Sequence, residues 1–262
     1  MCYWVGSKKV RDELFRRFQE NPDDEIAQLY YHTFIAPNKE NEHARLEPKG
    51  YYVAIGKGKP ELTVLTRVNQ QLKFKNLVWG LKWSYTNKDG KTIHRELLNS
   101  MSEKVFWMHK DIIYQNRCVV PIDGYFEFYH FQGEAYPHFI YPKGSGLFYA
   151  GGIWESHVNE ETGEVSETLS ILTTPANPVT RRLHNNPKAP NGPRMLLFIE
   201  PDKVLDYLNS GLKQNEINSF FKPFDENKMQ YHPVVKFLKR ENSEYINSPK
   251  VQEPFEYPEL VA

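Results

Sequence analysis

Short strand-like runs follow one another through the middle of this chain, and they limit its fold more than any other feature does. Runs rich in aromatic and β-branched residues are separated by Gly, Pro and Asn, which end strands or form turns. Between residues 117 and 174 the runs are RCVVPIDGYFEFYHF, HFIYP, LFYAGGIWESHV and ETLSILTT. This density of short strands predicts a twisted antiparallel or barrel-like sheet in one continuous domain.

The spacing of apolar residues predicts a few helices beside this sheet. One is expected over residues 8–20 and another over Ser102–Tyr114, with Ser102 as its N-cap and Trp107 on its apolar face. A third helix is expected to begin at Pro201 and end at Gly211. The pattern as a whole predicts an α+β fold.

No internal repeat or linker divides the 262 residues, so we expect a single domain over 1–262. Its core is expected over about 2–240, followed by an extended C-terminal tail over about 241–262. The segment NEETG at 159–163 is a hairpin turn signal between two strand-like runs.

Charge and cysteine content narrow the functional classes. Lys plus Arg and Asp plus Glu each number 33, so the chain has no net charge, and a polyanion would need a local basic patch. Its two cysteines, Cys2 and Cys118, cannot make a disulfide framework, which favours a reducing compartment. The sequence has no apolar run long enough to span a bilayer and no secretory signal pattern, so a cytoplasmic, intracellular protein is expected.

Cys2 is the residue with the most distinctive chemistry. The initiator Met is normally trimmed before a small side chain, and Cys2 would then carry an α-amine with a pKa of about 7.7–8.0 beside a thiol with a pKa of about 8.5. An aldehyde can form a Schiff base with the amine, and the thiol can close on the imine carbon to give a thiazolidine. Alone, a cysteine at position 2 is better explained by a disordered tail without function.

Six segments in a fixed order carry a family resemblance. They are MCYW at the start, LVWGLKWSY at 77–85, LLNSMSEK at 97–104, RCVVPIDGYFEF at 117–128, FYAGGIWES at 148–156 and TTPANPVTRRLHNNPKAPNGPRM at 173–195. From Cys2 to about Val235 this order resembles the SOS response-associated peptidase (SRAP) family. These abasic-site processing proteins cap abasic sites in single-stranded DNA.

The resemblance implies a catalytic set and a set of DNA contacts. It places the catalytic residues at Cys2, Asn99, Glu127 and His184. It also places Trp79 and Leu81 beside the DNA. The chain departs from the family pattern at several positions, and Phe128 and Leu196 stand where the family has Trp and Pro. Met101 and Lys104 stand where the family has Arg and Thr, and an insertion separates His184 from Arg194.

The residue types themselves suit this chemistry. A histidine that titrates near neutrality, such as His184, can move the protons that open a ring-closed sugar. A partly desolvated carboxylate such as Glu127 can accept a proton and return it while the carbinolamine loses water. Asn99 can orient the amine or a sugar oxygen. Lys104, Arg181 and Arg194 can contact phosphates, and tryptophans can stack on bases.

Each of these residues also has an interpretation without function. An isolated glutamate in an aromatic strand commonly faces solvent, Asn99 can serve as a turn or helix cap, and any one of nine histidines is seldom catalytic. Cys118, between apolar residues, is predicted to be a small buried hydrophobe. Trp83 and Trp154 are predicted to lie in the core.

No metal or cofactor site is predicted. The histidines at 130, 138 and 157 lie in separate strand-like runs, with no HExxH motif and no cysteine pair. The segment GKGKP lacks the spacing of a phosphate-binding loop.

Three functional hypotheses follow. The first is a monomeric protein that binds single-stranded DNA containing an abasic site and crosslinks to it through Cys2, with some lyase activity. The second is a cysteine-dependent peptidase that uses Cys2 with His184 and Asn99. The third is a noncatalytic nucleic-acid-binding module.

Overall fold

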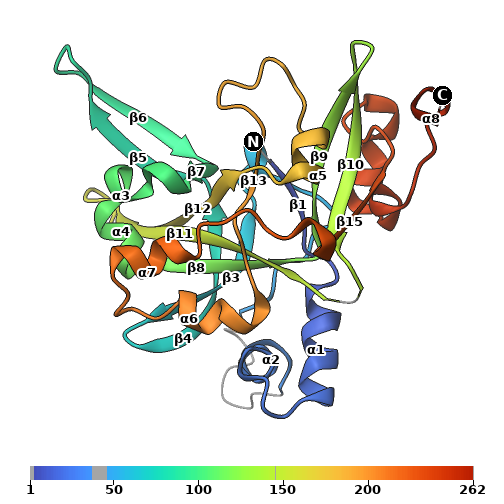
Figure 1. Cartoon of the computed structure of the whole chain (residues 1–262). Coiled ribbons are helices and arrows are strands. Elements are labelled where there is room, and N and C mark those ends of the chain that lie inside the picture. The colour runs from blue at the N-terminus through green and yellow to red at the C-terminus, as the bar shows by residue number, and fades with distance from the viewer. Residues whose placement is uncertain (1–2, 37–45, 145, 262) are drawn as a thin grey trace.

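A five-stranded barrel lies at the centre of the computed structural model, which describes residues 3–36, 46–144 and 146–261 (Figure 1). Each strand pairs with the next around a closed ring, and only the β12–β4 pair is parallel. In ring order the strands are β4 (Gln71–Trp79), β3 (Glu61–Val68), β8 (Arg117–Ile122), β11 (Phe148–Val158) and β12 (Val165–Pro175). The predicted barrel-like sheet is therefore confirmed.

Shorter strands extend the barrel at its rim. They are β7 (Asn99–Met101) and β13 (Arg194–Leu196), which pair with β12, and β14 (Phe198–Ile199), which pairs with β11. A two-stranded hairpin of β5 (Leu81–Thr86) and β6 (Thr92–Leu97) projects from the barrel at the upper left of Figure 1. The predicted turn at 159–163 does join β11 to β12, with Gly163 at a positive φ of 70°.

A second sheet of five strands packs against the barrel. Its order is β15 (Met229–Pro233), β10 (Glu134–Pro142), β9 (Gly124–Phe131), β1 (Trp4–Gly6) and β2 (Ala54–Ile55). One cluster of buried residues contains Val5 and Tyr125 from this sheet together with Val64 and Ile171 from the barrel. The two sheets therefore share one hydrophobic core.

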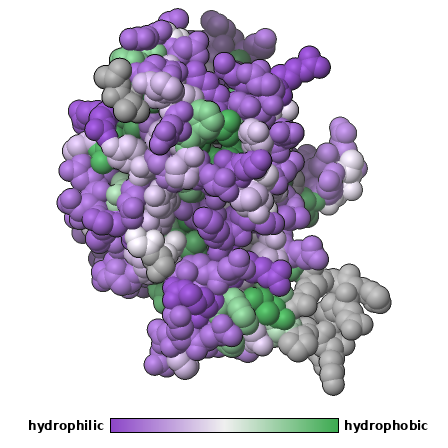
Figure 2. All heavy atoms as spheres, turned by 90° about the vertical axis from the view of Figure 1, so that its right-hand side faces the viewer, coloured by the Kyte–Doolittle hydropathy of each residue, from purple (hydrophilic) through white to green (hydrophobic). Residues whose placement is uncertain are grey.

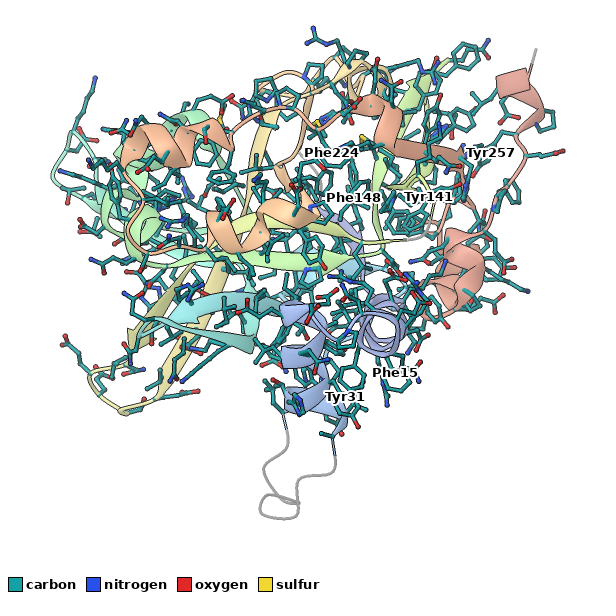
Figure 3. All side chains as sticks on the ribbon, turned by 60° about the horizontal axis from the view of Figure 1, so that its bottom comes forward. Phe15, Tyr31, Tyr141, Phe148, Phe224 and Tyr257 are labelled. Carbon is teal, nitrogen blue, oxygen red and sulfur yellow. The ribbon has the colours of Figure 1, made fainter. Side chains whose placement is uncertain are left out.

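Aromatic rings fill much of this core. Phe148 stacks on Phe198 with ring centroids 4.2 Å apart, and Phe224 meets Phe148 edge-on at 5.5 Å. Phe148 and Phe224 come from distant parts of the chain and point toward each other in Figure 3. The face of the molecule in Figure 2 is mainly hydrophilic, with small and separate hydrophobic areas. Most of the aromatic content thus serves packing.

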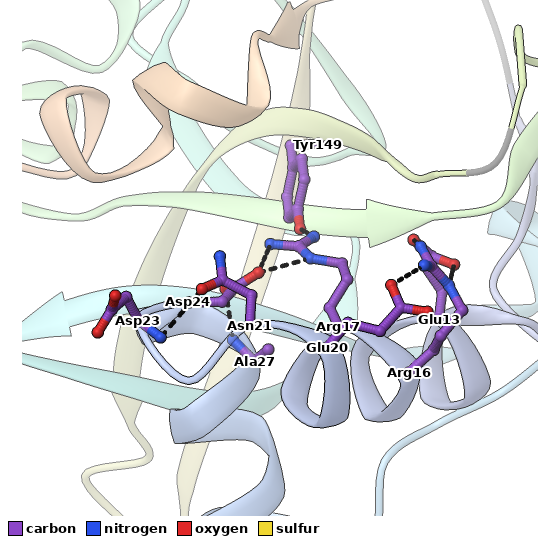
Figure 4. A network of polar contacts seen from close by, with 9 residues as sticks. All are labelled: Glu13, Arg16, Arg17, Glu20, Asn21, Asp23, Asp24, Ala27 and Tyr149. Carbon is purple, nitrogen blue, oxygen red and sulfur yellow. Dashed lines mark hydrogen bonds and ion pairs between the residues drawn. The ribbon is translucent and has the colours of Figure 1, made fainter.

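The first helix confirms its prediction to within two residues. The helix α1 (Val10–Glu20) begins where the buried Asp123 carboxylate accepts a hydrogen bond from the backbone N–H of Lys9, at 3.0 Å. Arg17 on α1 binds both the carboxylate of Asp24 and the hydroxyl of Tyr149 on β11 (Figure 4). Asp24 also caps α2 (Glu25–Tyr30), which continues into a π-helical turn, Tyr31–Ile35.

The predicted helix over 102–114 is wrong in form. The segment is a 3-10 turn (Ser102–Lys104), then α3 (Val105–Met108) and α4 (Lys110–Gln115), and Ser102 makes no side-chain cap. The break lies at His109, which is buried with Nε2 3.2 Å from the hydroxyl of Ser100. Trp107, expected on the apolar face, is 78% exposed because the break turns that residue outward.

The C-terminal segment is not the extended tail that the sequence predicts. It forms 3-10 turns over Arg240–Asn247 and Pro249–Gln252 and ends in α8 (Pro258–Val261). Val251 is buried, and Gln252 donates a hydrogen bond to the carbonyl of Tyr52, at 2.9 Å. These contacts hold the segment against the second sheet.

The other helical elements are short. They are the 3-10 turns Gly56–Gly58, Pro201–Lys203 and Glu226–Lys228, and the helices α5 (Pro178–Leu183), α6 (Val204–Tyr207) and α7 (Gln214–Ser219). The helix predicted over 201–211 thus ends four residues early, at Tyr207. No helix of the described segments is long and apolar enough to cross a membrane.

Candidate active site

Glu127 lies in the middle of β9, on the side of the sheet that faces α5. Its side chain is almost fully buried, and burial raises its pKa from 4.5 to about 8 because the carboxylate loses its water. Oε2 lies 3.6 Å from Nδ1 of His184, and Oε1 has no hydrogen-bond partner among the described residues. Glu127 is therefore a neutral acid at neutral pH and can donate a proton.

His184 is positioned by α5, a helix of six residues with local signals at both ends. Asn177 caps its start by accepting a hydrogen bond from the N–H of Thr180 at 2.8 Å, and Pro178 fills the first helical position. The N–H of His184 donates to the carbonyl of Thr180 at 2.7 Å. The hydroxyl of Thr180 also meets that of Tyr125 on β9, at 3.0 Å.

A double hydrogen bond then fixes the end of α5 to the strand that carries Glu127. The side chain of Asn185 accepts from the backbone N–H of His130 at 2.7 Å and donates to its carbonyl at 2.8 Å. Sequence analysis missed Asn185, although the pair of asparagines directly after His184 was visible. These two hydrogen bonds help to bring His184 next to Glu127, which lies 57 residues earlier in the sequence.

The contacts of His184 define its tautomer. Nδ1 lies 3.0 Å from the carbonyl oxygen of Arg194 and 3.6 Å from Oε2 of Glu127, and the N–H of Arg194 lies farther from it, at 3.5 Å, than the carbonyl does. The shorter contact to a carbonyl assigns the proton to Nδ1, so Nε2 is the basic nitrogen. Burial lowers the pKa of His184 because the imidazolium loses hydration.

Arg194 was predicted to contact DNA, and this prediction is wrong. Its side chain is buried and binds both carboxylate oxygens of Glu103, at 3.0 and 2.7 Å, and the hydroxyl and carbonyl of Thr173, at 3.0 and 2.8 Å. Desolvation raises the pKa of Glu103, but the hydrogen bonds from Arg194 outweigh it and lower that pKa overall. Arg194 on β13 therefore joins β12 to the 3-10 turn Ser102–Lys104, and its carbonyl orients His184.

A cavity of about 360 Å³ opens onto the Glu127–His184 pair. Tyr3 and Trp4 form one wall, and the insertion that follows His184 forms another through residues such as Lys188. Cys2 lies outside the described residues. Tyr3, the next residue in the chain, is held by its carbonyl, which accepts a hydrogen bond from Gly56 at 2.8 Å.

Asn99 does not line this cavity. It begins β7 and pairs with Ile171 of β12, and the carbonyl of the preceding Leu98 accepts hydrogen bonds from the N–H of Ile171 and the indole of Trp79. The contacts of His184 described above come from Arg194 and Glu127. The structure thus brings two of the four predicted catalytic residues into direct contact.

Some of the predictions for the tryptophans and for Leu81 are wrong. Trp79 and Leu81 have no exposed surface and belong to the core, so they cannot stack on DNA in this conformation. Trp154 is buried, as predicted, whereas Trp83 is half-buried and stacks on Tyr85 with ring centroids 4.8 Å apart. The alternation of apolar and polar residues along a strand could not reveal that other parts of the protein cover both faces of β4 near its end.

Of the remaining predicted residues, the two basic ones are exposed and the cysteine is buried. Lys104 and Arg181 are exposed, and their contact with DNA stays a prediction. Cys118 is fully buried, and burial raises the pKa of its thiol far above the usual value. No group of three or more His, Cys, Asp or Glu within the described segments could hold a metal ion.

Comparison with known proteins places this site in a family. The model of the SOS response associated peptidase (SRAP) family matches residues 1–240. The chain belongs to the SRAP family. This family membership makes it a protein of the DNA-damage response. A search of curated proteins finds no match.

Solved structures share this SRAP fold at low sequence identity. A protein from Bacteroides thetaiotaomicron is 22% identical, with a TM-score of 0.71 over 97% of this chain and 100% of its own. A protein from Bordetella bronchiseptica is 16% identical, with a TM-score of 0.63 over 89% of this chain and 99% of its own. A phage-related protein from the same organism is also 16% identical, with a TM-score of 0.58 over 90% and 95%. The family match ends at residue 240, so α8 lies beyond it.

Proposed function

We propose that this SRAP protein binds single-stranded DNA at an abasic site and forms a thiazolidine with the sugar aldehyde through Cys2, after removal of Met1. The supporting observation is the buried Glu127–His184 pair on the wall of a cavity that Tyr3 also lines. Consecutive Cα atoms are only about 3.8 Å apart, so chain connectivity keeps the amino-thiol close to Tyr3.

The two buried residues divide the proton transfers. Nε2 of neutral His184 takes the proton of the C1′ hydroxyl and returns it to the ring oxygen as the C1′–O4′ bond breaks, which frees the aldehyde. The amine of Cys2 adds to the aldehyde carbon, and protonated Glu127 donates its proton to the departing hydroxyl, which leaves as water. The thiolate then adds to the imine carbon. One aldehyde and one amino-thiol thus give one thiazolidine and one water.

The Schiff-base intermediate also permits strand cleavage. A base that removes a proton beside the imine carbon would expel the 3′ phosphate by β-elimination. Closure of the thiazolidine competes with this step because it consumes the imine. We therefore propose that lyase activity is the minor outcome and increases when the thiol is replaced.

A denaturing gel tests the crosslink. The purified protein is incubated with a labelled oligonucleotide that carries one abasic site, and a band of lower mobility is expected. Cys2→Ala should abolish this band, whereas Cys118→Ala, which removes the buried thiol, should retain it. An unchanged band in Cys2→Ala would refute the role of Cys2. Mass spectrometry should also show that Met1 is absent, because a retained Met1 blocks the amine.

The peptidase that the family name suggests is the second candidate. A papain-like arrangement needs an amide side chain that orients the catalytic histidine. Here the carbonyl of Arg194 and the carboxyl of Glu127 lie beside Nδ1 of His184, where a papain-like enzyme has its amide side chain. This geometry favours the aldehyde chemistry. Release of a peptide from a protein substrate, lost in Cys2→Ala, would instead support the peptidase.

A further inference from the structure

A second cavity, of about 330 Å³, is lined by residues of α5, the second sheet and α8. Tyr129 and Phe131 of β9, His138 of β10 and Arg182 of α5 line it. Tyr129 comes two residues after Glu127, and Arg182 comes two residues before His184. β9 and α5 are neighbours in Figure 1, and besides carrying the candidate catalytic pair they also line this cavity.

The walls of this cavity are aromatic and carry one cation, Arg182, and one carboxylate, Glu259, which accepts a hydrogen bond from Tyr136. The rings of Tyr129 and Phe131 are nearly parallel, at 12°, with centroids 6.2 Å apart. The guanidinium of Arg182 lies 5.1 Å from the ring centroid of Tyr231, and Arg182 forms no ion pair with a described residue. Flat apolar faces next to an exposed guanidinium suit a stacked base with an attached phosphate.

A buried histidine adds a specific polar group. His138 is only 6% exposed, and Nδ1 lies 3.0 Å from the carbonyl of Tyr136, so Nδ1 carries the proton and Nε2 is an acceptor. Nε2 has no hydrogen-bond partner among the described residues. Burial lowers the pKa of His138, which keeps the ring neutral. A neutral acceptor in an aromatic cavity matches the exocyclic amino group of adenine or cytosine.

We propose that this cavity binds the nucleobase of a nucleotide that flanks the abasic position in the same DNA strand, with its phosphate on Arg182. The inference rests on the proposed function, since it names a further contact of that substrate. Along β9, at about 3.3 Å per residue, Tyr129 and Phe131 lie about 7 and 13 Å from Glu127. This spacing places the base near the abasic sugar and outside the reacting cavity.

The far wall of this cavity comes from a segment that the family model does not match. Glu259 and Leu260 of α8 line it, and they lie beyond the residues that the family model matches. The hydroxyl of Tyr136 donates to Glu259 at 3.0 Å and holds α8 in place. The folded C-terminal segment thus turns an open aromatic surface into a cavity.

Binding measurements test this subsite without relying on the crosslink. The ligand is a single-stranded oligonucleotide that has no abasic site and carries a fluorescent adenine analogue. Fluorescence anisotropy gives the Kd of the full-length protein for it, and quenching of the analogue reports stacking. Phe131→Ala and Arg182→Gln should each raise Kd by about 5- to 100-fold, since one stacked base or charged contact is lost. Trp107→Ala, which removes an exposed ring outside both cavities, should leave Kd unchanged.

The outcomes separate the two proposals. Equal Kd values and equal quenching for wild type, Phe131→Ala and Arg182→Gln would overturn the subsite, whether or not the protein crosslinks. If both variants bind more weakly than wild type, and the wild-type protein forms no adduct, the subsite is supported and the proposed function is refuted. Arg182 is exposed, so Arg182→Gln should retain the fold, and thermal melting checks this.

Discussion

Replacing Glu127 by glutamine should stabilise the protein while it removes the proposed acid. Burial raises the pKa of this carboxyl from 4.5 to about 8, so the folded protein holds the proton more tightly than the unfolded chain does. Between these two values the folded state binds more protons, and stability therefore falls as pH rises. Glutamine has nearly the same shape and no charge, so Glu127→Gln escapes this loss.

The size of the effect follows from the shift in pKa. At about 1.36 kcal/mol per unit, ionising Glu127 in the folded protein costs about 4–5 kcal/mol once the pH exceeds both pKa values. At pH 5 nearly all of the folded protein is protonated, and the cost is below about 1 kcal/mol. The advantage of Glu127→Gln over wild type should thus grow by about 4 kcal/mol between pH 5 and pH 9.

Urea denaturation followed by tryptophan fluorescence at pH 5, 7 and 9 measures this difference in unfolding free energy. Glu161→Gln, at an exposed position in the β11–β12 turn, is the matched control and should show no trend with pH. The adduct should meanwhile fall strongly in Glu127→Gln, because the amide cannot donate a carboxylic proton. The reasoning is refuted if the advantage of the variant is the same at pH 5 and pH 9.

Four further substitutions test the elements that hold the site and one exposed position beside it. Trp79→Ala should cost about 3–5 kcal/mol of unfolding free energy in denaturation curves, as expected for a buried ring. Gly124→Ala should cost at least about 1–3 kcal/mol, because a Cβ there would lie 2.6 Å from the carbonyl oxygen of Ile140. Arg194→Met should lower both stability and adduct yield, whereas Arg181→Ala should change stability by less than about 0.5 kcal/mol and weaken only DNA binding.

Local patterns were sufficient to predict most of the fold. The alternation of aromatic and β-branched residues with turn residues predicted the barrel, and helical spacing predicted α1. The segment 102–114 failed because helical periodicity does not reveal that His109 turns inward to meet Ser100. The C-terminal segment failed because its 3-10 turns are stabilised by distant partners, such as the carbonyl of Tyr52, that no local pattern contains.

For the candidate site too, some residues could be predicted from the sequence, whereas the roles of others depend on distant partners. Glu127 and His184 could be named because the ordered family motifs mark them, whereas their residue types alone fit positions without function. The role of Arg194 could not, because charge near a histidine is equally compatible with a phosphate contact and with an ion pair to Glu103, 91 residues away. Trp79 similarly looks like an exposed aromatic until the neighbouring strands are placed around it.

The pKa shifts of the buried pair predict how the reaction depends on pH. Burial raises the pKa of Glu127 to about 8 and lowers that of His184, so both groups enter the reaction uncharged and avoid the desolvation cost of a buried ion pair. The attacking amine, with a reference pKa of about 7.7–8.0, must also be neutral.

Adduct formation should thus rise with pH as the amine loses its proton and fall above about pH 8 as Glu127 ionises. Single-turnover crosslinking rates from pH 6 to 10 measure this bell-shaped profile. A rate that still rises at pH 10 would show that protonated Glu127 is not the acid.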